Sequence, residues 1–210
     1  MSEEKNRHVI LSIEAAIQGG SLSLFENDKE IDCWFGQADV SKAEDILEQI
    51  ENLFKRNDLK KNSLKLITAS AGAGSSTGLK IGVSLAKGLS KSLGCRFFHT
   101  PILEALLLKS DNNIYGPVVT AVPIGKDLIC RQVFKDSFTP EDSESPQIHT
   151  AVEFFEQLAE CNFVQAICHE AVIVLLQTKL NVLGNINIIN AGKNLAKIIG
   201  THATIKLSRV

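Results

Sequence analysis

The sequence lacks the features that mark membrane-spanning and secreted proteins. No apolar run in its 210 residues approaches the roughly 20 residues needed to span a bilayer. The five cysteines are odd in number and show no CxxC spacing, which is typical of reduced thiols in the cytosol. The N-terminal MSEEKNRH is acidic and polar, unlike a secretory signal. These absences predict a cytoplasmic protein with no membrane segment.

Sequence motifs of several enzyme classes are also missing. There is no GxSxG elbow of an α/β-hydrolase and no GxxxxGK[ST] loop of a P-loop nucleotidase. The histidines are spread along the chain without the spacing of metal ligands. Cys161, Cys168 and His169 lack the fourth ligand and the close pairs that a zinc centre uses. We therefore expect no catalytic residue and no metal site.

Charge is small in total but unevenly distributed. The formal net charge of −2 argues against binding to nucleic acid through a strong basic field alone. Residues 1–60 carry seven Lys/Arg and thirteen Asp/Glu, whereas residues 61–109 carry seven and one. Such asymmetry either steers one surface towards a partner or cancels within the fold.

Residues 66–94 form the stretch around which the chain is organised. Residues 66–70 read as a buried strand, and residues 71–76 as a tight Gly-rich loop. Hydroxyl side chains then stand where a helix N-terminus needs acceptors for its free N–H groups. The pattern predicts a helix from about Thr77 to Leu93, with Gly94 as its stop.

This helix combines a face of small residues with a wide apolar arc. Gly78, Gly82 and Ala86 recur every four residues, although a glycine inside a helix costs up to about 1 kcal/mol relative to alanine. The apolar arc covers roughly 200°, more than a one-sided surface helix requires. We interpret the small face as a contact with a helix of another chain; an ordinary core helix is the alternative. The predicted interface residues are Ile46, Ile50, Leu53, Gly78, Leu79, Gly82, Val83 and Ala86.

The rest of the first half predicts one compact α/β lobe. Three strand-like runs, at residues 8–15, 21–25 and 30–35, precede a helix over residues 41–56 that begins with the capping box Ser41 and Glu44. A short strand at residues 95–99 and a short helix at residues 101–109 follow the central helix. The resulting order is β-β-β-α-β-α-β.

The second half starts a similar pattern again. Residues 117–122 and 128–134 read as a hairpin, residues 136–146 as an exposed loop and residues 150–158 as a helix. Residues 164–183 are compatible with either a helix or a buried strand. A strand-like run near residues 187–190, a short helix to Ile199 and a last strand at residues 203–207 complete the expectation. We expect two lobes, at residues 1–112 and 113–210, with the second one smaller.

The central stretch resembles the signature of the TsaB (YeaZ) family, bacterial proteins needed to form threonylcarbamoyladenosine on tRNA. The family pattern is G-P-G-S-F-T-G-L-R-I-G, then A-K-G-L and S-L-E-A-L, over about forty residues. Here Ala73, Ser76 and Lys80 replace the proline, phenylalanine and arginine. The matching positions are Gly72, Gly74, Ser75, Thr77, Gly78, Leu79, Ile81, Gly82, Ala86, Lys87, Gly88, Leu89, Leu103, Glu104, Ala105 and Leu106.

The resemblance implies the ribonuclease-H-like, actin-like ATPase (ASKHA) superfold, with a reduced second lobe. It implies a non-catalytic partner of the catalytic protein TsaD in modification of tRNA adenosine 37. The resemblance further implies a TsaE-like ATPase as another partner and a homodimer when the protein is alone. It also implies that contact with tRNA is indirect, and that no cofactor is bound beyond ATP or ADP at a partner interface. The chain lacks the histidines that bind metal in TsaD, and also lacks the D-A-R segment of TsaB proteins.

Two turns are candidates for phosphate binding, although the residues favour a plain hairpin turn for the first and a loop shaped for close packing for the second. The first turn contains Gly19 and Gly20, whose backbone N–H groups could hold a phosphate. It follows Glu14, which stands at the position where enzymes of this superfold carry a metal-positioning aspartate. The second is the loop with Gly72, Gly74 and Ser75 at a helix N-terminus, where the dipole favours an anion. The glycine spacing of this loop, GxGxxxG, is not the Rossmann fingerprint. These turns leave a small ATP-dependent phosphotransferase as the alternative function, and a divergent homodimer with an altered role as a third.

Overall fold

The computed structural model describes residues 8–17, 19–37, 42–137, 139–177, 183–184 and 186–208. Ser41 and the side chain of Glu44, which form the predicted capping box, lie outside this description. The chain divides into two compact units. Unit 1 comprises Met1–Gly72, Ser76–Pro101 and Asn194–Val210, and unit 2 comprises Ala73–Ser75 and Ile102–Lys193.

Unit 1 is built on a five-stranded mixed sheet with the order β3-β2-β1-β4-β5. Antiparallel pairing joins β1, β2 and β3, and parallel pairing joins β1 to β4 and β4 to β5. The predicted order β-β-β-α-β-α-β is confirmed over the described residues. The strands and helices are β1 (Val9–Glu14), β2 (Ser21–Glu26), β3 (Lys29–Phe35), α1 (Lys42–Arg56), the 3-10 turn η2 (Lys61–Ser63), β4 (Leu64–Ser70), α2 (Ser76–Leu93) and β5 (Arg96–Thr100).

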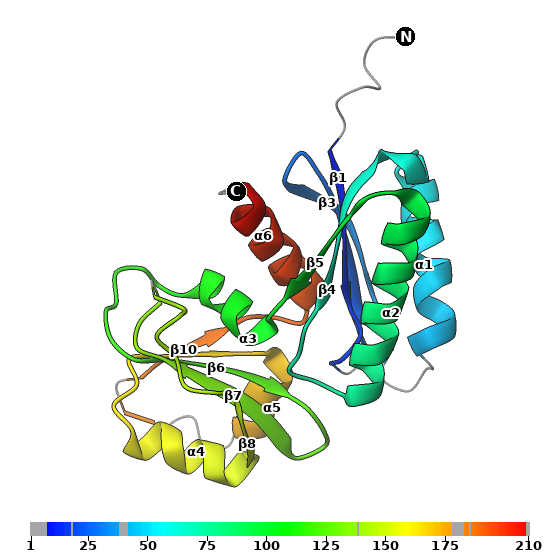
Figure 1. Cartoon of the computed structure of the whole chain (residues 1–210). Helices are drawn as coiled ribbons and strands as arrows, with labels where there is room; N and C mark the ends of the chain where they lie inside the picture. The colour runs from blue at the N-terminus through cyan, green and yellow to red at the C-terminus, as the bar shows by residue number, and fades with distance from the viewer. Residues whose placement is uncertain are drawn as a thin grey trace. The chain divides into compact units, whose positions relative to one another are not determined.

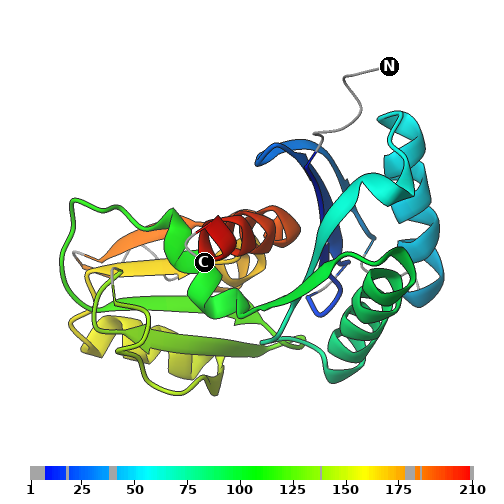
Figure 2. The ribbon, with the colours of Figure 1, turned by 45° about the horizontal axis from the view of Figure 1, so that its top comes forward.

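Both faces of this sheet are covered by helices. Helices α1 and α2 lie on one face, and α6 (Leu195–Ser208) lies on the other, as Figures 1 and 2 both show. Every residue of the central strand β1 is buried in consequence. Double coverage explains why the VILSIE sequence of β1 is almost continuously apolar instead of alternating.

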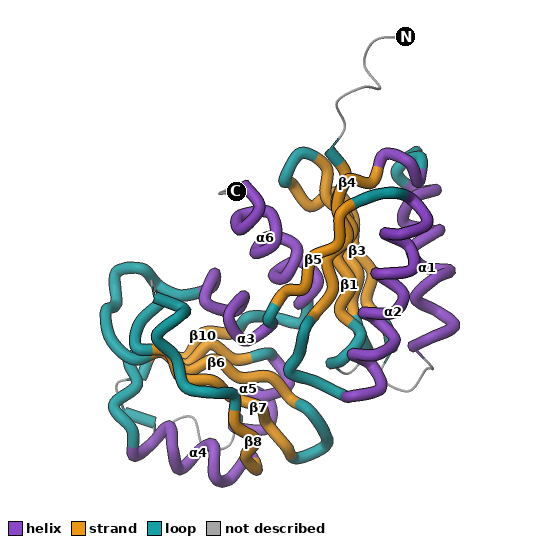
Figure 3. Tube along the Cα trace, in the orientation of Figure 1, coloured by secondary structure: helices purple, strands orange, loops and turns teal. Residues whose placement is uncertain are grey.

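Unit 2 repeats this strand topology, and most of its elements are shorter. Figure 3 shows its strands in orange and its helices in purple. Its sheet order is β10-β9-β6-β7-β8, with β6, β7 and β8 antiparallel and with β9 parallel to β6 and β10. The segment 164–183, left open by the sequence, contains both a strand and a helix. The elements are α3 (Ile102–Ala105), η3 (Leu106–Lys109), β6 (Val118–Pro123), β7 (Leu128–Phe134), β8 (Gln147–Thr150), α4 (Ala151–Glu160), β9 (Gln165–Cys168), α5 (Glu170–Leu176) and β10 (Asn187–Asn190).

The C-terminal segment differs from the sequence prediction. The strand predicted at residues 203–207 is wrong, and the helix predicted to end at Ile199 continues, because one helix, α6, spans both segments. The division at residues 112 and 113 also differs from the observed units: α3 and η3 belong to unit 2, and α6 belongs to unit 1. The cause is packing, since the apolar side of α6 covers Ile10, Phe25 and Leu66 of the first sheet.

Buried serines fix the position of α6 on that sheet. The Ser12 hydroxyl donates to the carbonyl oxygen of Ala196 at 2.6 Å, and the backbone N–H of Ala196 donates to the Ser21 hydroxyl at 3.0 Å. Asn194 accepts from the N–H of Lys197 and so caps the helix. A Cβ at Gly200 would lie 3.1 Å from the Cβ of Ser12, so the helix approaches the sheet closely there.

Replacing Ser21 with alanine should lower the free energy of unfolding by about 1–3 kcal/mol, because it leaves the buried N–H of Ala196 without its acceptor. Thermal or denaturant unfolding measures the change. The control is Ser84→Ala, at an exposed position of α2, where we expect a change within about 0.5 kcal/mol. Equal effects of the two substitutions would show that the serine contact does not hold α6.

A pH dependence follows from the buried His169 in unit 2. Its Nδ1 accepts from the N–H of Ala171 and caps α5, and burial lowers the pKa of His169 to about 4. The unfolded chain, with an ordinary pKa of about 6.5, binds the proton first as the pH falls. Stability is therefore lost as the pH falls from about 6.5 to about 4, by up to about 3 kcal/mol.

The variant His169→Asn keeps a capping side chain without a titrating ring. It should therefore lose less stability than the wild type between neutral pH and about pH 4. Denaturant titrations at a series of pH values test this, with His8→Asn at an exposed histidine as the control. An unchanged pH profile for His169→Asn would contradict the assignment.

Candidate functional site

Glu14 is turned into the fold at the end of β1. Its side chain is buried, and its carboxylate accepts from the backbone N–H groups of Ala16 and Ile17 at 2.6 and 2.8 Å. These N–H groups are the donors that a phosphate at this turn would need. The carboxylate thus closes the turn, which gives Glu14 a structural role.

Gly19 and Gly20 continue the same turn with positive φ angles of 83° and 71°. The N–H of Gly20 donates to the carbonyl oxygen of Ile17, and the N–H of Gly36 donates to that of Gly20. A Cβ at Gly19 would collide with the carbonyl oxygen of Gly36. Close backbone packing therefore accounts for both glycines. Their assignment to phosphate binding stays a prediction.

The second predicted turn joins β4 to α2. Gly72 and Gly74 have φ angles of 109° and 145°, which L side chains rarely adopt. The hydroxyl of Ser70 accepts from the N–H of Gly72 at 3.3 Å, and Ser75 is partly buried just before α2 begins. Binding of an anion by Gly72, Gly74 and Ser75 also stays a prediction.

The small face of α2 packs inside unit 1. The buried residues of this helix are Gly78, Gly82, Ala86 and Ser90. A Cβ at Gly78 would overlap the carbonyl oxygen of Ala15, and a Cβ at Gly82 would lie 3.2 Å from the Cβ of Ala15. The helix therefore sits directly on the end of β1 and the turn after it. Close approach is confirmed, but the neighbouring backbone belongs to the same chain.

Most of the residues predicted to form the interface are buried inside unit 1 for this reason. Ile46, Ile50 and Leu53 of α1 join the same apolar core of unit 1, with exposures of 0%, 4% and 0%. Gly78, Gly82 and Ala86 are buried against β1 or within the core. These side chains cannot reach a second protein without opening unit 1. Leu79 and Val83 remain partly exposed.

A different set of residues forms the outer surface of the two helices. Ser84, Gly88 and Ser92 are exposed and recur every four residues on α2. A Cβ at Gly88 would meet no atom within 4 Å, so nothing in the described part of the chain accounts for this glycine. Leu47 of α1 is 47% exposed. The sequence analysis missed this second stripe. The first stripe has the same spacing of four residues and contains two glycines, whereas the second contains one.

The opposite flank of α2 faces the edge strand β5. The Nζ of Lys87 lies 5.8 Å from the ring centroid of Phe97 on β5. Leu85 lies on the far side of the helix from Lys87, because each residue turns the helix by about 100°. It packs against the core cluster that contains Ile46 and Ile50 of α1. The stripe of Ser84, Gly88 and Ser92 therefore borders the α1 side of the surface.

The cysteines and histidines of the described residues offer no cluster for a metal ion, and burial makes one thiol, that of Cys168, unreactive. All five cysteines are free, and burial raises the pKa of Cys168 to about 12. A thiol with such a pKa stays protonated at neutral pH and is a poor nucleophile. No group of three His, Cys, Asp or Glu in the described part of the chain is placed to hold a metal ion. Among the helices described, none is long and apolar enough to cross a membrane.

A family model matches part of the chain. The model described as TsaD, tRNA N6-adenosine threonylcarbamoyltransferase, matches residues 37–136. No curated protein sequence matches the chain significantly.

Solved structures share the fold over nearly the whole chain. YeaZ from Pseudomonas aeruginosa superposes with a TM-score of 0.65 at 10% identity, covering 96% of this chain and 94% of that one. An uncharacterized protein with similarity to peptidase YeaZ, also from Pseudomonas aeruginosa, gives 0.63 at 12% identity, with 97% and 93% covered. An inorganic polyphosphate/ATP-glucomannokinase from Arthrobacter sp. strain KM gives 0.59 at 12%, with 96% and 99% covered. These likenesses confirm the predicted superfold.

Alanine substitutions at two glycines of α2 should change the stability of the protein in opposite directions. Gly78→Ala should lower the free energy of unfolding by about 1–3 kcal/mol, because its Cβ would overlap the Ala15 carbonyl and force α2 outwards. Gly88→Ala should raise it by up to about 1 kcal/mol, because the site is open and alanine is the better helix former. Denaturant unfolding of the two variants tests the pair. The packing account would be contradicted if Gly78→Ala were as stable as Gly88→Ala.

Proposed function

We propose that this chain, which resembles the TsaB (YeaZ) proteins in its motif and its fold, is a non-catalytic binding partner in tRNA threonylcarbamoyladenosine formation. The observation that carries the proposal is the YeaZ fold over 96% of the chain. The match of the TsaD family model to residues 37–136 supports the same pathway. In this role the chain acts in the cytoplasm, and its partner is a protein similar to TsaD.

The surface for this partner is the outer side of α1 and α2. Three features support the choice: the exposed Leu47, the partly exposed Ile81 and Leu85, and the stripe of small residues centred on Gly88. Small exposed residues let a second helix approach closely, and partly exposed apolar side chains gain from being covered. A helix of the partner laid along α2 would account for a glycine that no internal contact requires.

A non-catalytic role agrees with the chemistry of the described residues. Glu14 stands where a metal-positioning carboxylate is expected, but its oxygen is committed to the N–H groups of Ala16 and Ile17. This commitment disfavours the phosphotransferase alternative. ATP or ADP would then bind at an interface with a partner, and a TsaE-like ATPase would be a further member of the assembly.

The proposal predicts association with the TsaD-like protein of the same organism. Gly88→Leu should weaken that association at least tenfold, because a bulky side chain separates the helices while leucine favours the α2 helix itself. Size-exclusion chromatography with light scattering measures the complex. Without the partner, the same surface should pair two copies, giving twice the 22.9 kDa of one chain.

A matched control is Gly125→Leu, which makes the same change at an exposed glycine of unit 2. This variant should associate like the wild type. The surface assignment would be wrong if Gly88→Leu bound the partner with unchanged affinity. The function itself would be wrong if the wild-type chain formed no complex with the TsaD-like protein.

A further inference from the structure

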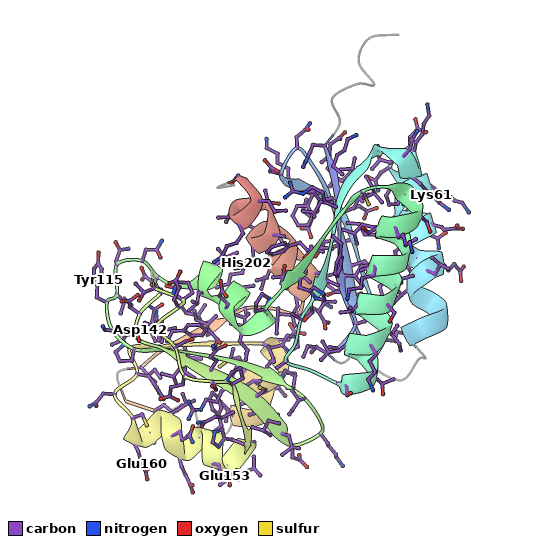
Figure 4. All side chains as sticks on the ribbon, viewed as in Figure 1. Lys61, Tyr115, Asp142, Glu153, Glu160 and His202 are labelled. Carbon is purple, nitrogen blue, oxygen red and sulfur yellow. The ribbon has the colours of Figure 1, made fainter. Side chains whose placement is uncertain are left out.

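One surface of unit 1 is basic and has no acidic residue near it in the sequence. Residues 61–100 contain six Lys or Arg and no Asp or Glu. Lys61 is neutralised by Glu51 of α1 at 2.7 Å, and Figure 4 labels it beside that helix. None of the ion pairs in the described residues involves Lys80, Lys87 or Lys91. Their charge is therefore available to a partner.

These three lysines lie on one side of α2. Positions 80, 87 and 91 fall within an arc of about 40°, since successive residues turn by about 100°. All three are exposed, and the stripe extends for about 16 Å at 1.5 Å per residue. A line of cations with this length fits a linear polyanion better than a single small anion.

Aromatic rings stand next to the lysine stripe. The β5 residues Phe97 and His99 form an edge-to-face pair with centroids 4.6 Å apart. The Lys87 ammonium lies over the Phe97 ring, and burial together with that nearby charge lowers the pKa of His99. The side chain of His99 is exposed, and β5 is the edge strand of the sheet. A neutral, exposed ring at a sheet edge is accessible to another flat ring.

We propose that the lysine stripe of α2, together with Phe97 and His99 of β5, is a binding surface for single-stranded RNA. The lysines contact successive phosphates, and an unpaired base stacks on His99. The rings distinguish this partner from an acidic protein, which has no base to stack. The choice of RNA over DNA rests on the proposed function. The surface lies on the β5 side of α2, and the protein partner proposed above uses the α1 side.

Fluorescence anisotropy with a labelled single-stranded RNA and the full chain alone tests the surface. The combined variant Lys80→Gln, Lys87→Gln and Lys91→Gln should bind at least tenfold more weakly at about 50 mM salt. The slope of log affinity against log salt should become shallower by about 2, at about 0.7 per lost phosphate contact. The control variant removes the same charge from exposed lysines elsewhere, at Lys29, Lys55 and Lys126.

A second pair of variants separates stacking from charge. His99→Ala should weaken binding about tenfold with little change in the salt slope, and His99→Phe should restore it. The proposal is overturned if the wild type does not bind the RNA, or if the control triple variant loses as much affinity as the stripe variant. Displacement of the RNA by polyglutamate at equal charge concentration would also overturn it in favour of an acidic protein. No partner protein is present in this assay, so its outcome is independent of the association test.

Discussion

The close contact of α2 with the end of β1 is the constraint on which unit 1 depends. Because Gly78 and Gly82 have no side chains, the helix axis lies near enough for the Ala15 and Ala16 backbone to fill the space of a Cβ. That contact determines the distance between α2 and the sheet of unit 1. It also fixes which residues of α2 remain outside, including Gly88 and the lysine stripe.

The second constraint is that each mixed sheet has two apolar faces to cover. In each unit, the two helices between the parallel strands cover one face only. Helix α6, which follows β10 in sequence, belongs with the first sheet, whereas α3 and η3, which follow β5, belong with the second. The division of the chain into units is therefore set by burial of apolar surface, not by the order of the sequence.

The geometry gives separate roles to the two kinds of glycine in the family-like motif. Gly78 and Gly82 serve internal packing, so their presence carries no information about a partner. Gly88 has open space around it and is the glycine for which an external contact is the physical explanation. Likewise, Glu14 shows that an acidic residue at a familiar position can serve the backbone instead of a ligand.

The sequence by itself determined the first seven elements and their order, the stop of α2 at Gly94 and the superfold. These features depend on local signals: β-branched runs, turn glycines, helix periodicity and one motif of about forty residues. The sequence did not determine what packs against the small face of α2. Periodicity indicates that a face is buried, but it does not identify the chain that buries it. The sequence also led to the wrong secondary structure for residues 195–208, because their apolar pattern is typical of either a buried helix or a strand. Only the tertiary structure decided that case. Helix α6 packs against Ser12, Ser21 and Phe25, which lie more than 170 positions in the sequence before the residues that they contact.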